Sequence, residues 1–149
     1  MTIDPRFHEH EEAIIRAFVI RERQERFIYL LENPKRRQKF TRELGHFRWF
    51  DARFAAPLPW KVDPALSLWG RHQQGIDNIW RLLKAKGAGQ FCWVISGNAK
   101  LDGQELELKS ALESRSEGTI LSCIPGRLAY FEGEDESLLL SRFADPLHK

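Results

Sequence analysis

The sequence predicts an α+β fold, in which N-terminal helices pack on a small mixed or antiparallel sheet of about four strands. Apolar residues recur at helical spacing in the first half of the chain, whereas the second half holds short apolar runs separated by turn residues. The length of 149 residues suits one domain, and 42% hydrophobic residues, with ten Phe and five Trp, suffice for an aromatic core. We therefore expect residues 1–149 to fold as a single domain.

A first helix is predicted over about residues 5–19, because apolar residues recur there at spacings of three, four and seven. Residues 21–26 are all charged or polar. The helix therefore either continues with one solvated turn or breaks and restarts, and the pattern leaves both alternatives open.

The pair Asn33-Pro34 marks the start of another helix, because Asn caps helix starts well and Pro fits the first helical position. We expect this helix to cover residues 34–44 and to end at Gly45. Its narrow buried side would carry Phe40 and Leu44, and its exposed side would carry cations.

Residues 46–64 are rich in aromatic residues and prolines but show neither a helical nor a strand period. We expect an ordered loop that its rings anchor to the core, because flexible linkers are not normally aromatic. The next helix is predicted over residues 73–86, where Gly87 follows a basic last turn. Its apolar face would carry Ile76, Ile79, Trp80 and Leu83.

Strands are predicted in the rest of the chain, at residues 90–96, 119–124, 127–132 and 138–143. The pair Pro125-Gly126 favours a tight turn, so the strands on either side of it should form an antiparallel hairpin. Between the first two strands, Asp102-Gly103 marks a turn and residues 106–113 are predicted to form a short helix.

No apolar run approaches the roughly 20 residues that a membrane-spanning helix needs, and the N-terminus lacks the features of a signal peptide. We therefore expect a cytoplasmic protein that does not act at a membrane. Cys92 and Cys123 each lie in an apolar run, which favours reduced, buried thiols over a redox or nucleophilic role. Two cysteines cannot form a cysteine metal site, and no motif requires a cofactor, so we expect none.

Residues 33–53 carry seven basic and two acidic side chains, a local balance of +5 in a chain of net charge +2. Phosphate recognition requires cations spaced along a surface, and neighbouring aromatic rings can stack on unpaired bases. The cations expected to hold a polyanion are Arg36, Arg37, Lys39, Arg42 and Arg48. The alternative is a solvated helix face with rings that only anchor the core, and the small net charge favours that alternative.

A second candidate set lies within residues 102–109. An Asp followed by a Glu-x-Lys run resembles the arrangement by which one nuclease superfamily holds a divalent metal and activates water. The residues that would act as metal ligands or acid–base groups are Asp102, Glu105, Glu107 and Lys109. In those enzymes the Glu-x-Lys lies on a strand, whereas residues 106–113 are predicted to be helical. A turn residue with carboxylates in a first helical turn is therefore the alternative.

The five histidines show no recognisable catalytic or metal-binding frame; they are His8, His10, His46, His72 and His148. His8 and His10 stand two residues apart, so a helix would point them in different directions. Small polar residues end two of the predicted strands, at residues 96–98 and 122–126, where they either line a pocket or form ordinary turns.

Two stretches in the second half of the chain resemble those of a known protein family. They contain Val94-Ile95-Ser96, Leu101-Asp102-Gly103 and Ser122-Cys123-Ile124-Pro125-Gly126-Arg127-Leu128-Ala129-Tyr130-Phe131-Glu132. They resemble the C-terminal half of a family of small bacterial proteins of unassigned function. The resemblance implies a bacterial origin, and it supplies no activity that could be transferred to named residues.

The sequence favours a non-catalytic binding or regulatory protein that acts on a macromolecular partner, either a nucleic acid or another protein. The +5 segment and the lack of a catalytic frame in the sequence motivate this hypothesis. The alternative is a small metal-dependent hydrolase or nuclease whose polar residues meet only in the folded chain. A contiguous basic face with exposed rings would favour the first, and a deep pocket with two carboxylates or a His would favour the second.

Overall fold

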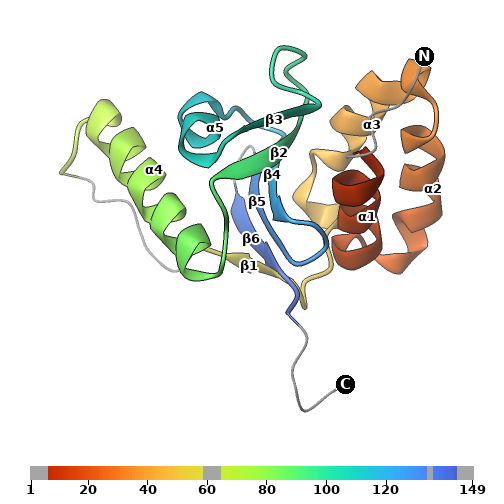
Figure 1. Ribbon diagram of the computed structural model, residues 1–149, viewed down its shortest axis with the longest axis horizontal. Coiled ribbons are helices and arrows are strands. Elements are labelled where there is room, and N and C mark those ends of the chain that lie inside the picture. The colour runs from red at the N-terminus through yellow and green to blue at the C-terminus, as the bar shows by residue number, and fades with distance from the viewer. Residues whose placement is uncertain (1–6, 59–64, 134–135, 144–149) are drawn as a thin grey trace.

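A six-stranded antiparallel sheet with helices against both of its faces forms the framework of the protein (Figure 1). The computed structural model describes residues 7–58, 65–133 and 136–143. The α+β class is confirmed. The number of strands is six rather than about four, and the described helices cover the sheet on two sides rather than one.

The strands are β1 (Ala55–Pro57), β2 (Phe91–Ser96), β3 (Gln104–Glu107), β4 (Thr119–Ile124), β5 (Leu128–Glu132) and β6 (Ser137–Ser141). They are ordered β1-β6-β5-β4-β2-β3, and each strand pairs antiparallel with its neighbours. The predicted hairpin around Pro125-Gly126 is confirmed, with Gly126 at a φ of 70°. The two edge strands, β1 and β3, are those that the sequence did not predict.

The first helical segment breaks after α1 (Ala13–Phe18), which follows a π-helical turn at Phe7–Glu12. Val19 is extended and forms a β-bridge with Phe50, and α2 (Arg21–Leu31) then begins. The bridge decides between the two alternatives for residues 21–26, because it pulls the chain out of helical geometry just before them.

The helix predicted over residues 34–44 is confirmed as a 3₁₀ turn at Pro34–Arg36 followed by α3 (Arg37–Leu44). The side chain of Asn33 caps the start, since its Oδ1 accepts a hydrogen bond of 3.0 Å from the backbone N–H of Lys35. Phe40 and Leu44 are buried as predicted.

Two helices cover the opposite face of the sheet. The first, α4 (Leu68–Ala85), begins five residues earlier than predicted, where Ser67 caps it. The second, α5 (Leu108–Ser114), begins two residues later than predicted, because the residues before it pair with β2 as β3.

The sheet separates two apolar cores, so its central strands are buried on both faces. On β2, Trp93 and Ile95 face the core beneath α1–α3, whereas Cys92 and Val94 face the core beneath α4 and α5. This explains why the run reads as continuously apolar rather than alternating. Cys92 is buried and Cys123 is half-buried, and both thiols are free. Trp80 is only partly buried at the margin of its core.

Candidate functional site

Arg37 lies inward, against two carboxylates between α3 and the sheet. Its guanidinium donates hydrogen bonds to both oxygens of Glu11 and, at 2.7 Å each, to both oxygens of Asp102. Glu11 has no exposed surface, and it also accepts a hydrogen bond of 2.7 Å from the indole N–H of Trp93. Arg37 is therefore engaged inside the fold, and the candidate polyanion surface is built from the other cations.

The Glu11–Arg37–Asp102 cluster joins three distant parts of the chain. Burial raises the pKa of the Glu11 carboxyl above its ordinary value, and the hydrogen bonds from Arg37 and Trp93 act in the opposite direction. Asp102 also accepts a hydrogen bond of 3.0 Å from the backbone N–H of Ser96 at the end of β2. The cluster thus fastens the N-terminal helices to the loop between β2 and β3.

His10 and Ser122 form a His–Ser pair that sequence spacing could not indicate, because 112 residues separate them. His10 Nδ1 and Ser122 Oγ lie 2.8 Å apart, and the imidazole stacks on Trp93 with 6.0 Å between ring centroids. Ser122 has no exposed surface, so a substrate cannot approach its hydroxyl in this conformation. The pair therefore extends the buried polar cluster.

The four residues of the second candidate set lie on three different segments. Asp102 pairs with Arg37, and Glu105 and Glu107 lie on the edge strand β3. Lys109 stands in the first turn of α5, 3.7 Å from Asp77. Among the residues that the structure describes, no group of three or more His, Cys, Asp or Glu side chains could hold a metal ion.

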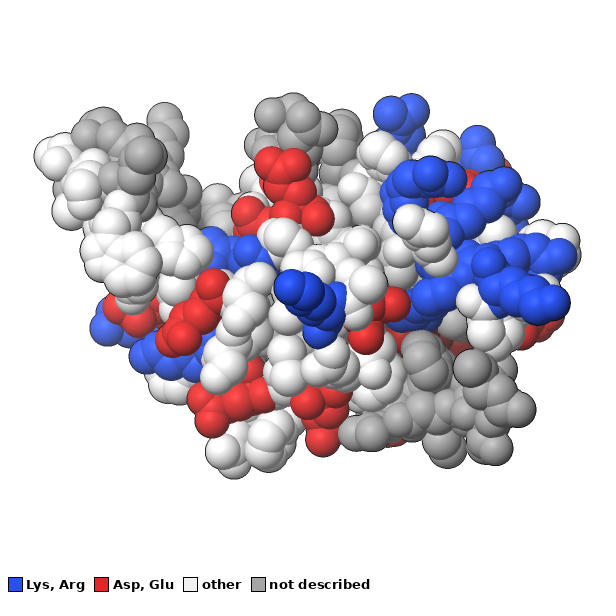
Figure 2. Space-filling view, turned by 90° about the horizontal axis from the view of Figure 1, so that it is seen from above, with Lys and Arg blue, Asp and Glu red and all other residues white. Residues whose placement is uncertain are grey.

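The remaining cations of the basic segment form a surface at the N-terminal helices, which we call the α3 basic surface and define as Lys35, Arg36, Lys39, Arg42 and Arg48. All are exposed except Arg36, which is half-buried. Within the described parts of the chain, none of the five forms an ion pair with a carboxylate. Figure 2 shows Lys and Arg side chains gathered over the helical end of the molecule to which this surface belongs.

Two aromatic rings lie within this surface. Tyr29 of α2 is 50% exposed, and the guanidinium of Arg36 lies 4.3 Å from its ring centroid. Trp49 has the guanidinium of Arg23 at 4.3 Å and that of Arg48 at 5.6 Å. These cation–π contacts hold three arginines beside rings that are open to solvent or only partly buried.

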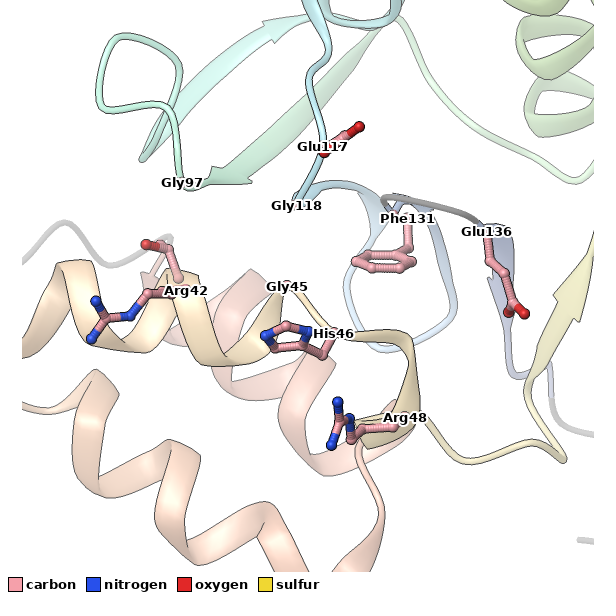
Figure 3. A pocket seen from close by; sticks show the side chains of 11 residues that line it. Arg42, Gly45, His46, Arg48, Gly97, Glu117, Gly118, Phe131 and Glu136 are labelled. Atoms are coloured by element: carbon pink, nitrogen blue, oxygen red, sulfur yellow. The ribbon is translucent and has the colours of Figure 1, made fainter.

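A cavity of about 480 Å³ opens where the C-terminal end of α3 meets the ends of several strands (Figure 3). One side is basic and the other is acidic. Its lining residues are Thr41, Arg42, Gly45, His46, Arg48, Gly97, Glu117, Gly118, Phe131, Gly133 and Glu136. Arg42 and Arg48 belong to both the cavity and the α3 basic surface, so the two features are continuous.

Glycines allow the helix and the sheet to approach closely at the cavity wall. A Cβ atom on Gly45 would lie 3.3 Å from the Cα atom of Gly118, and Gly118 itself has a φ of 75°, which favours glycine. Of the two strand ends considered from sequence, only residues 96–98 contribute to this cavity, through Gly97. No sequence pattern links these lining residues, because they come from five separate segments.

No family model, curated protein or solved structure matches the chain. Among the described helices, none combines the length and apolar character needed to cross a membrane. The features of the described chain that bear on function are the α3 basic surface and the cavity beside it.

Proposed function

We propose that this is a non-catalytic cytoplasmic protein that binds a polyanion, specifically a single-stranded nucleic acid, through the α3 basic surface. The resemblance noted in the sequence would make the protein bacterial. The observation that carries the proposal is the gathering of cations that have no carboxylate partner within the described chain, next to one exposed ring, Tyr29, and one partly buried ring, Trp49. Paired cations would have favoured a solvated structural face instead.

The spacing of the cations supports a linear ligand. Lys39 and Arg42 stand three residues apart on α3, which places them on one side of that helix, and Lys35 lies in the 3₁₀ turn directly before it. Through these turns the four residues from Lys35 to Lys39 rise about 6 to 8 Å, so successive cations can meet successive phosphates of one strand. A binding partner with a regular row of anionic groups fits this arrangement better than a compact anion.

The rings support a single strand over a duplex. Bases of a single strand can stack on aromatic side chains, whereas those of a duplex are already stacked on each other. Tyr29 is half exposed beside Arg36, so it offers such a platform next to a phosphate-binding cation.

The test is a titration of the full chain with labelled single- and double-stranded DNA and RNA at several salt concentrations. Three to five phosphate contacts predict a log–log salt slope of about 2 to 4. Lys35→Ala with Lys39→Ala should weaken binding and lower the slope. The matched control is Arg81→Ala with Lys86→Ala, two exposed cations at the other side of the sheet. No binding near physiological salt, or equal losses in both double variants, would overturn the proposal.

One observation favours the second candidate function, a small metal-dependent hydrolase or nuclease. The cavity is lined by His46, Glu117 and Glu136, which could serve as acid–base groups, although the described residues form no group of three that could hold a metal ion. The check is incubation of labelled DNA and RNA with the protein and Mg²⁺ or Mn²⁺. Shortening of the strand that His46→Ala abolishes would establish this alternative, whereas intact strands with retained binding would support the non-catalytic proposal.

A further inference from the structure

We infer that the cavity at the C-terminal end of α3 is a binding site for a guanine nucleotide, either free or as the phosphorylated end of the bound strand. The inference rests on the proposed function, since it names the nucleotide that the same surface presents to the cavity. The volume of about 480 Å³ lies within the range of roughly 300 to 1,000 Å³ that is usual for small-molecule sites.

The basic wall of the cavity is suited to the phosphate group. Arg42 comes from the last turn of α3, and His46 and Arg48 follow it in the next turn of the chain. A guanidinium offers paired N–H donors that match two phosphate oxygens. Arg42 and Arg48 also belong to the α3 basic surface, so a strand lying on that surface would deliver its end phosphate here.

The acidic rim is suited to the base. Glu117 and Glu136 are exposed, and neither forms an ion pair within the described parts of the chain. A carboxylate can only accept hydrogen bonds, so it selects a base that presents neighbouring donors. Guanine presents its N1–H and N2–H groups side by side, whereas uracil presents one N–H between two carbonyl oxygens that a carboxylate repels.

Gly97 provides a way to fill the cavity without changing its charges. It lines the cavity at the end of β2, and a Cβ atom placed on it would meet no atom within 4 Å. Gly97 is not among the glycines of positive φ, so a larger residue does not strain the backbone. Gly97→Leu should therefore fold normally and occupy the space that the ligand needs.

The experiment measures binding of GMP, AMP, CMP, UMP and inorganic phosphate to the full chain by calorimetry. We expect GMP to bind about tenfold or more tightly than UMP, which is the discrimination that a good paired contact to a base supplies. Glu117→Gln with Glu136→Gln should abolish this preference while phosphate binding remains. Gly97→Leu should weaken the binding of every nucleotide. Thermal unfolding of each variant checks that it is folded.

Further arms separate the sources of the nucleotide and the two proposals. An oligonucleotide with a terminal guanine phosphate that binds more tightly than GMP identifies a strand end, and equal affinity identifies the free nucleotide. Lys35→Ala with Lys39→Ala should weaken binding of a long strand but not binding of GMP. Failure of the proposed function can therefore be told apart from failure of the nucleotide site. Absence of GMP binding, equal affinity for GMP and UMP, or an unchanged affinity in folded Gly97→Leu would overturn the inference.

Discussion

Arg36 and Arg37 are neighbours in the sequence but occupy opposite environments. One helical residue turns the chain by about 100°, so Arg36 lies at Tyr29 on the surface while Arg37 lies over Glu11 and Asp102. The sequence could not assign these roles, because the partners of Arg37 stand 26 and 65 residues away from it. The density of cations along the chain indicated where the α3 basic surface lies. It did not indicate that Arg37 would turn inward and form no part of that surface.

Replacing Arg37 with Ala should destabilise the protein by about 3 to 5 kcal/mol, because it leaves the buried carboxylate of Glu11 without its cation. Urea unfolding measures the loss. Arg36→Ala is the matched control and should cost less than about 1 kcal/mol, since its cation–π contact lies at the surface. Equal losses in the two variants would contradict the assignment of the buried cluster.

The raised pKa of Glu11 predicts how stability depends on pH. As the pH rises above the ordinary value of 4.5, the folded chain keeps a proton that the unfolded chain has lost. The folded state then binds more protons, so this residue makes stability fall as the pH rises toward the raised pKa. Glu11→Gln has no such carboxyl group. Its free energy of unfolding should therefore rise relative to that of the parent as the pH increases over that window.

Unfolding free energies of parent and Glu11→Gln, measured from about pH 4.5 to neutral pH, check this expectation. Glu9→Gln removes an exposed carboxylate two residues away from Glu11 and should follow the parent curve. If the difference in unfolding free energy between Glu11→Gln and the parent stays constant with pH, the expected effect of Glu11 is contradicted.

Local signals predicted those elements whose ends depend on a few adjacent residues. Asn33 caps the start of the turn before α3, and Pro125-Gly126 turns the chain between β4 and β5. The two missed strands depend instead on distant partners. β1 has three residues including a proline, and β3 reads as mostly polar, so each is a strand only because a longer neighbour pairs with it.

The turn between β4 and β5 should tolerate Gly126→Ala poorly. Gly126 has a φ of 70°, and an L-residue in that region costs about 1 to 2 kcal/mol. The added Cβ atom would make only ordinary contact with Ala13 at 3.5 Å, so the loss reports backbone strain rather than crowding. Gly89→Ala, at a position with open space and no positive φ, is the control and should be neutral. Thermal unfolding distinguishes the two.

Across the whole molecule, the sequence predicted the class and the central strands but not the second helical layer or the cavity. Each layer depends on which face of the sheet a segment covers, and β2 carries apolar residues on both faces. The cavity unites residues from α3, the following turn and four strand ends, none of which is marked by its own neighbours. Its chemistry was therefore visible only in the fold.

A chain that ends at residue 136 should lose cooperative unfolding. It lacks β6, which lies between β5 and β1 and contributes Leu138 and Leu140 to one core and Leu139 to the other. Thermal unfolding followed by circular dichroism tests this. A chain that ends at residue 143 keeps every described strand and is the control. A sharp transition in the shorter chain would show that β1 and β5 do not need the strand between them.

The position of β1 in the chain also determines how long it waits for its partner strand during synthesis. Its only described strand partner is β6, which begins 80 residues later in the chain, at Ser137 after Pro57. At about 5 to 20 residues per second, a ribosome reaches β6 roughly 4 to 16 seconds after finishing β1. Until β6 has been made, the apolar face of α1 to α3 therefore lacks Leu138 and Leu140, which share its core in the folded protein.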